Sequence, residues 1–129
     1  HLGLKPQSVH KIGGFKVQGR EPDKAKEMLA AAQRLQNSGA VIVLLECVPN
    51  EVAETITKAL EVPVIGIGAG PDVDGQILVL YDILDITQGR TPRFVKNFQV
   101  GRDSPLAALQ SYVKAVKDKS YPEPEHCFS

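Results

Sequence analysis

The sequence lacks three features that would each point to a class of protein: an excess of one charge, a long apolar run and clustered cysteines. Lys plus Arg and Asp plus Glu both number 15, so the formal net charge is zero. This balance argues against a surface that mainly binds nucleic acid or an anionic membrane. No apolar run approaches the roughly 18 residues of a membrane-spanning helix. We therefore expect neither nucleic acid nor a membrane as a partner. The 129 residues, 43% of them hydrophobic, predict one globular domain with its own core.

The two cysteines, Cys47 and Cys127, do not have the spacing of metal ligands. One interpretation is a single disulfide between them. The interpretation that we favour is a pair of free thiols, as in a cytoplasmic protein.

The chain is organised around the stretch Val41–Pro49, which reads Val-Ile-Val-Leu-Leu-Glu-Cys-Val-Pro. Its first five residues are all apolar and predict a strand, Val41–Leu45, that is buried on both faces. Glu46 stands where this run ends, and in parallel α/β folds ligands bind at the carboxyl ends of the strands. Glu46 is therefore a candidate catalytic or ligand-binding group. The alternative is a carboxylate satisfied by nearby backbone N–H groups.

Helices and strands are expected to alternate along the rest of the chain. The predicted helices are Asp23–Ser38, Glu51–Leu60, Val73–Leu84 and Pro105–Lys119, and the further strands are Val62–Ile67 and Phe94–Phe98. His1–Leu4 is too short to be predicted as a strand, and Ser120–Ser129 is a proline-bearing tail. Within the last helix, Leu106, Leu109, Val113 and Val116 are expected to point inward. Repeated βα units predict a parallel sheet.

Two glycine-bearing segments allow more than one interpretation. Lys5–Arg20 is a long basic loop, which favours a lid over the site, with a disordered surface loop as the alternative. Gly66–Gly70 does not have dinucleotide-binding spacing, so packing at a strand end is favoured over a ligand site. Gln76–Leu84 has the composition of a strand. We expect a helix there because parallel neighbours need a longer crossover than the chain offers.

Three strands make a poor parallel sheet, whereas a closed eight-stranded barrel takes about 250 residues. The chain has about half that length and opens on His-Leu-Gly-Leu, so we expect a piece of a larger molecule.

Several strings along the whole chain resemble ketopantoate hydroxymethyltransferase. They are His1–Leu4, Pro6–Ser8, Gly13–Arg20, Leu45–Pro49, Pro63–Gly70, Asp74–Val79, Tyr121–Pro122 and Glu125–His126. The resemblance implies a (βα)8 TIM barrel of the phosphoenolpyruvate/pyruvate type, of which residues 1–129 would be the carboxyl-terminal half. Residues 1–20 would follow the fifth strand, strands six to eight would come next, and residues 120–129 would be the tail. The family also assembles into large rings of identical subunits.

The resemblance implies transfer of a hydroxymethyl group from 5,10-methylenetetrahydrofolate to 3-methyl-2-oxobutanoate. The product, 2-dehydropantoate, leads to pantothenate and coenzyme A. In the family, Mg²⁺ is bound by carboxylates on the first four strands, so we expect no metal ligand in this chain and the amino-terminal half of the barrel as its partner. The acidic residues Asp72, Asp74, Asp82 and Asp85 lie at predicted helical or loop positions and do not replace those ligands.

The resemblance also implies roles for four residues. Glu46 matches the family's proton acceptor at the end of the sixth strand. His1 falls at a strand end and is expected to face the substrate. Lys16 and Arg20 are expected to contact the anionic folate tail, with solvated surface charges as the alternative.

Three functional hypotheses follow. The favoured one is a transferase that is active only with the front half of the barrel. The second is a non-catalytic half-barrel that self-associates to cover its apolar edges. The third is a small nucleotide-binding domain built on Gly66–Gly70.

Overall fold

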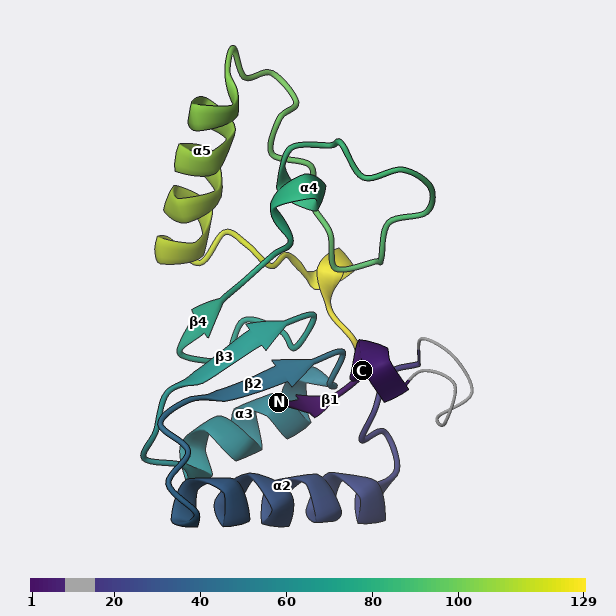
Figure 1. Cartoon of the computed structure of the whole chain (residues 1–129), viewed down its shortest axis with the longest axis vertical. Coiled ribbons are helices and arrows are strands. Elements are labelled where there is room, and N and C mark those ends of the chain that lie inside the picture. Colours follow the sequence, from purple (N-terminus) through teal and green to yellow (C-terminus); the bar gives the residue numbers. More distant parts are fainter. Residues whose placement is uncertain (9–15) are drawn as a thin grey trace.

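A four-stranded parallel sheet forms the centre of the fold in a computed structural model that describes residues 1–8 and 16–129 (Figure 1). The strands are β1 (Leu2–Gly3), β2 (Val43–Glu46), β3 (Val64–Ile67) and β4 (Gly75–Gln76). They are hydrogen-bonded in that order, each parallel to the next. The α-helices are α2 (Pro22–Asn37), α3 (Asn50–Ala59), α4 (Leu80–Ile83) and α5 (Pro105–Lys117), and the short 3-10 helices are η1 (Pro6–Ser8) and η2 (Pro124–His126). The prediction of a parallel α/β fold is confirmed.

The first predicted helix is confirmed as α2, and its two ends have local causes. Pro22 occupies the first turn, where a missing N–H is tolerated. Gly39 follows the helix with a φ of +95°, the left-handed conformation that glycine adopts at little cost. The strand that follows starts two residues later than predicted. Val41 and Ile42 are exposed, and the pairing with the sheet begins at Val43.

The main core lies between the sheet and the layer formed by α2 and α3, which pack on the same face (Figure 1). Val43, Leu45 and Val64 contribute side chains from the sheet, and each is at most 1% exposed. Ala32 of α2 and Ile56 of α3 meet them from the helices. Val52 and Leu60, four residues to either side of Ile56, also pack against this core, so the apolar stripe of the helix faces the sheet.

The prediction that His1–Leu4 is too short for a strand is wrong. Leu2 pairs with Leu45, and Gly3 with Glu46. Two residues suffice because the neighbouring strand β2 provides the partner groups, which a local reading of the sequence does not reveal.

The prediction of a strand at Phe94–Phe98 is also wrong, since this segment has no strand pairing. Phe94 and Phe98 are each 5% exposed, but they enter two different core clusters. Phe94 packs with Leu4 and Ile67, and Phe98 packs with Tyr121. The apolar residues of this segment therefore anchor a loop.

The predicted helix Val73–Leu84 is wrong for most of its length, because β4 occupies Gly75–Gln76 and α4 has only four residues. Asp74 ties the chain to the start of β3: its N–H donates to the Val64 carbonyl at 2.9 Å, and its carboxylate accepts from the Val64 N–H at 2.8 Å. Because β4 has only two residues and pairs with Ile65 and Gly66, the chain has to run back only a short distance from the end of β3 before it can pair in parallel. The segment between β3 and β4 can therefore be short and contain no helix.

The last helix, α5, lies with α4 on the opposite side of the sheet from α2 (Figure 1). Leu109 and Val116 pack against a cluster that contains Phe98, as predicted. Leu106 and Val113, which were also predicted to point inward, are 64% and 48% exposed. Helical spacing identifies an apolar stripe but does not say how much of it the same chain covers.

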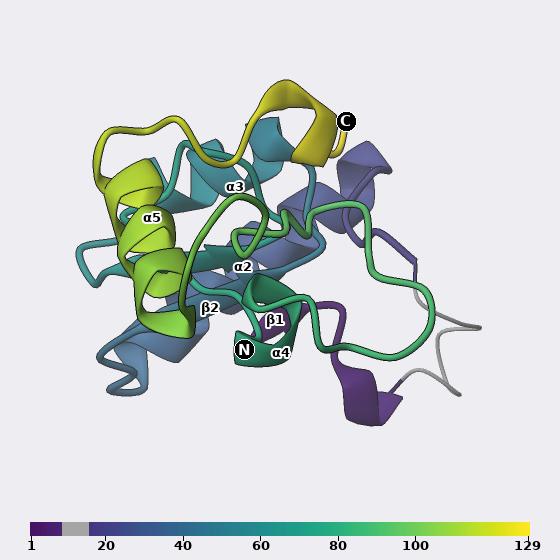
Figure 2. The ribbon, with the colours of Figure 1, turned by 90° about the horizontal axis from the view of Figure 1, so that it is seen from above.

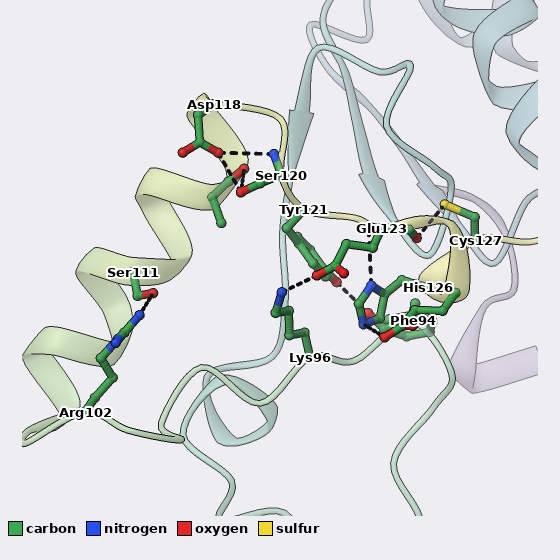
Figure 3. Close-up of polar contacts among 12 residues, drawn as sticks. Phe94, Lys96, Arg102, Ser111, Asp118, Ser120, Tyr121, Glu123, His126 and Cys127 are labelled. Atoms are coloured by element: carbon green, nitrogen blue, oxygen red, sulfur yellow. Dashed lines mark hydrogen bonds and ion pairs between the residues drawn. The ribbon is translucent and has the colours of Figure 1, made fainter.

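The carboxyl-terminal tail returns from α5 across the molecule to the start of α3, where the Asn50 N–H donates to the Phe128 carbonyl at 3.0 Å (Figure 2). Its contacts are drawn in Figure 3. Glu123 pairs with Lys96, and its N–H donates to His126 Nδ1 at 3.1 Å. These contacts hold the tail in place without a strand or a long helix.

Replacing Tyr121 with phenylalanine tests this anchoring of the tail. The Tyr121 hydroxyl donates to the Phe94 carbonyl at 2.5 Å, and the side chain is 3% exposed. Because the variant leaves a buried carbonyl unsatisfied, we expect the free energy of unfolding to fall by about 1–3 kcal/mol. Urea denaturation measures it. Tyr81→Phe, at a residue that is 59% exposed, is the control and should change stability by less than about 0.5 kcal/mol.

Within residues 1–8 and 16–129, no helix is both long enough and apolar enough to cross a membrane.

Candidate active site

Glu46 is the last residue of β2, an inner strand, at the end of the sheet where the carboxyl ends of all four strands lie. Its side chain is 15% exposed. Burial raises the pKa of this carboxyl above its ordinary value, because the ionised form loses solvation. A carboxylate in such surroundings is a better proton acceptor than one in water.

The backbone around Glu46 is held from both sides. The Leu4 N–H donates to the Glu46 carbonyl at 2.8 Å, and the Cys47 N–H donates to the Ile67 carbonyl at 3.0 Å. Cys47 has a φ of +51°, an uncommon left-handed conformation for a residue other than glycine. Backbone strain of this kind persists only where the surrounding structure fixes it, and the hydrogen bonds on either side of Glu46 do so here.

His1 lies next to Glu46, with 3.1 Å between His1 Nε2 and Glu46 Oε2. His1 directly precedes β1, the neighbouring strand, and its side chain is 33% exposed. This contact can orient the carboxylate, and it favours the ionised form when the imidazole is protonated. The structure thus brings together two of the four predicted site residues, while the substrate-facing role of His1 stays a prediction.

Lys16 and Arg20 are both exposed. Between them, the Gln18 N–H donates to the Cys47 carbonyl at 2.9 Å, which places this part of the loop beside the turn after Glu46. Arg20 Nε donates to the Ser129 carbonyl at 3.0 Å and so ties the loop to the tail. Residues 9–15 of the predicted lid, Lys5–Arg20, lie outside the described residues, so the lid and the folate contacts stay predictions.

Among residues 1–8 and 16–129, no three His, Cys, Asp or Glu side chains form a group that could hold a metal ion. Two of the aspartates have other contacts. Asp74 accepts from the Val64 backbone, as described above, and buried Asp82 accepts from the Thr87 hydroxyl at 2.6 Å. The described side chains therefore do not fit a Mg²⁺ site by themselves.

The glycines of Gly66–Gly70 pack against side chains. A Cβ on Gly68 would lie 2.5 Å from the Phe94 ring, and one on Gly70 would lie 2.3 Å from Asn50 Oδ1. Both glycines have positive φ, +62° and +79°. This close packing favours the structural interpretation of the segment over a phosphate-binding loop.

Gly3 and Cys47 are the features of this site that sequence reasoning missed. A Cβ on Gly3 would lie 2.1 Å from the Glu46 carbonyl oxygen, so only glycine lets β1 come this close. One signal for the turn was present in the sequence, because the apolar run ends at Leu45 and Pro49 cannot continue the strand. No feature of the sequence indicated that Gly3 lies beside Glu46.

Both cysteines are free thiols, as we favoured. Burial, with a smaller contribution from Glu46, raises the pKa of the Cys47 thiol to about 12. At pH 8 we therefore expect native Cys47 to react with a thiol reagent at least about 10³-fold more slowly than an exposed cysteine. Mass spectrometry of peptides after timed labelling measures it, with the urea-unfolded chain as the control. Fast labelling of the native protein would contradict this account of the turn.

The fold and the site together define an α/β protein that presents a half-buried carboxylate at the carboxyl edge of a parallel sheet. The family model described as ketopantoate hydroxymethyltransferase matches residues 1–124. A 3-methyl-2-oxobutanoate hydroxymethyltransferase of Chromohalobacter salexigens is 56% identical over 128 residues, which cover 99% of this chain and 49% of that protein. The protein of that name from Alkalilimnicola ehrlichii is 59% identical, over 99% of this chain and 46% of its own length.

This chain belongs to the ketopantoate hydroxymethyltransferase family. It spans about half the length of the relatives that it matches.

Proposed function

We propose that this chain supplies the second half of a (βα)8 barrel of the phosphoenolpyruvate/pyruvate type, and that the whole barrel transfers a hydroxymethyl group to 3-methyl-2-oxobutanoate. The position of Glu46 carries the proposal: it is a half-buried carboxylate with a raised pKa at the edge where barrel enzymes have their sites. The names of the relatives support the substrate, and the half-length match supports the missing front half.

Four parallel strands are half of the eight that a closed barrel needs. In this proposal β1 is the end of the fifth strand, and β2 and β3 are the sixth and seventh. The eighth is β4 rather than the segment Phe94–Phe98. The barrel would close when the first four strands join β1 to β4.

In the reaction, we propose that Glu46 removes the proton from C3 of the keto acid. The electron pair of the C–H bond moves into the C2–C3 bond and the carbonyl pair moves onto the keto oxygen, which gives an enolate. C3 of the enolate forms a bond to the methylene carbon of 5,10-methylenetetrahydrofolate, both C–N bonds to this carbon break, one water supplies the hydroxyl group, and tetrahydrofolate leaves. Partial burial keeps water from competing for the carboxylate, and His1, 3.1 Å away, fixes its orientation.

Several parts of the proposal concern groups outside this chain. Mg²⁺ would be held by the front half and would supply polarisation of the keto group. Lys16 and Arg20 would contact the folate tail, since the loop that bears them runs beside the turn after Glu46. The product would enter pantothenate and coenzyme A synthesis in the cytoplasm, and the subunits would form a homo-oligomer.

Isotope exchange in a continuous barrel tests the function. In this experiment, the 128 residues of this chain that match the Chromohalobacter salexigens relative, at 56% identity, replace the matching segment of that relative. With Mg²⁺ and 3-methyl-2-oxobutanoate in D₂O, we expect NMR to show loss of the C3 proton signal. A folded chimera that exchanges no faster than buffer, beside a relative that does exchange, would refute the proposal.

A non-catalytic, self-associating half-barrel is the second candidate. The observation that favours it is the number of large apolar side chains, among them Leu80 and Tyr81, that this chain leaves exposed.

A further inference from the structure

The end of the carboxyl-terminal tail lies beside the turn that follows Glu46. The Phe128 side chain packs against the core cluster that contains Cys47, the residue directly after Glu46, and Ile67 at the end of β3. Phe128 also meets the Phe94 ring edge to face, with 6.5 Å between the ring centroids. The last aromatic residue of the tail is therefore part of the packing around this turn.

Hydrogen bonds connect the same turn to the tail through the loop that precedes α2. The Gln18 N–H donates to the Cys47 carbonyl at 2.9 Å. Cys47 is the strained residue of the turn, with a φ of +51°, and such strain persists only where neighbouring groups hold it. Two residues further along the loop, Arg20 Nε donates to the Ser129 carbonyl at 3.0 Å. The loop therefore bonds to the turn on one side and to the tail on the other.

The tail returns to the turn at the start of α3. The Phe128 carbonyl accepts from the N–H of Asn50, the first residue of the helix, at 3.0 Å. The N–H groups of a first helical turn have no partner within the helix, so the tail supplies one here. Because Asn50 directly follows Pro49, the path from the turn through loop and tail closes on itself. Arg93 holds the tail as well, since its Nε donates to the Glu125 carbonyl at 2.8 Å and its guanidinium lies over the Phe128 ring.

We propose that Arg20 and Phe128 are positioning residues for the proton transfer, which act through the tail to hold the turn after Glu46, and with it the carboxylate, in place. The inference rests on the proposed function, in which Glu46 is the base. Arg20 and Ser129 are 109 residues apart in the sequence, so no group within the turn itself can replace their bond. A displacement of about 1 Å at a reacting group can cost about 10²-fold in rate, so loss of these contacts should be visible in the reaction.

Arg20→Gln in the continuous chimera tests the proposal. The variant loses the bond to the Ser129 carbonyl, and we expect kcat for C3 exchange to fall by about 10-fold while KM for the keto acid stays within about 2-fold. The assay contains no folate, so a residue that only contacted the folate tail would leave the exchange rate unchanged. Arg102→Gln is the matched control: Arg102 Nη2 donates to the Ser111 hydroxyl at 3.0 Å, away from the tail (Figure 3). It should exchange at the parent rate.

Phe128→Ala removes the aromatic ring from the cluster beside the turn and should lower kcat by about 30-fold or more. Phe128→Leu keeps an apolar side chain there and should restore kcat to within about 3-fold of the parent. Gly39→Ala controls for lost stability. It strains the end of α2, where nothing lies within 4 Å of the added Cβ, and should leave kcat unchanged. Circular dichroism of each variant checks that it is folded.

Thiol labelling of the 129-residue chain is a second measurement, which does not depend on activity. Cys47 is 7% exposed and reports directly on the turn. We expect a thiol reagent to label it about 10-fold faster in Phe128→Ala and in Arg20→Gln than in the parent, and at the parent rate in Arg102→Gln. Mass spectrometry of the peptides distinguishes Cys47 from Cys127.

An unchanged kcat for C3 exchange in either Arg20→Gln or Phe128→Ala would overturn the proposal, as would a raised KM with an unchanged kcat. The failure of the proposed function is distinguishable. If the parent chimera does not exchange but Cys47 is labelled faster in both variants, the function is refuted and the tail still holds the turn. If labelling of Cys47 is unchanged in both variants, the tail does not hold the turn, whatever the chimera does.

Discussion

Replacing Glu46 with glutamine is expected to slow C3 proton exchange of 3-methyl-2-oxobutanoate in the continuous chimera by about 10²–10⁴-fold, the usual contribution of a general base. Glutamine has nearly the same shape but cannot accept the proton. NMR in D₂O measures the exchange rate at saturating keto acid. Glu61→Gln, at an exposed carboxylate beyond the other end of the sheet, is the matched control and should exchange at the parent rate.

The same substitution, which should lower the exchange rate, is expected to raise the stability of the folded chain at pH 8. Because burial raises the pKa of Glu46, the folded chain binds this proton more tightly than the unfolded chain does. The stabilisation from the protonated carboxyl is complete below the unfolded pKa and is lost as the pH rises through the folded pKa. Glutamine does not titrate, so the variant should match the parent at pH 4 and be the more stable of the two at pH 8.

Thermal unfolding of the 129-residue chain at the two pH values measures this difference. Loss of exchange with a gain in stability at pH 8 is the signature of a group kept for its chemistry rather than for packing. A variant that is less stable at pH 8 would show instead that the contact with His1 outweighs the cost of burying the charge. Glu46 would then be a structural carboxylate, the alternative that the sequence left open.

Glu46 could be placed from the sequence because two local signals agree there. The apolar run Val41–Leu45 predicts a buried strand, and Pro49 ends it, so the carboxylate has to stand near the carboxyl end. His1 could be placed only at a strand end. Its contact with Glu46 depends on the pairing of β1 with β2, which joins residues more than forty positions apart.

The error at β4 has a related cause. The composition of Gln76–Leu84 pointed to a strand, and the crossover rule overrode it. That rule assumes a strand of ordinary length, whereas Asp74 fixes a two-residue strand by hydrogen bonds to Val64. The exposed apolar residues after β4 could not be predicted at all, because their cover lies outside this chain in our proposal.

The largest effect on stability is expected from Gly3→Ala. The added Cβ would lie 2.1 Å from the Glu46 carbonyl oxygen and 2.8 Å from Val48 Cγ2, so β1 would have to move off β2. Gly3 also has a φ of +86°, which costs an alanine about 1–2 kcal/mol by itself. Together with the lost strand pairing, we expect the free energy of unfolding to fall by about 3 kcal/mol or more.

Gly39→Ala separates the two causes. Gly39 has a similar φ of +95°, but nothing lies within 4 Å of its added Cβ, so this variant carries the backbone strain without the collision. Urea denaturation should show a loss of about 1–2 kcal/mol for Gly39→Ala and a clearly larger one for Gly3→Ala. Equal losses in the free energy of unfolding of the two variants would mean that a Cβ at position 3 does not collide with β2. In the continuous chimera, Gly3→Ala should also slow C3 exchange, because the carbonyl that it displaces belongs to Glu46.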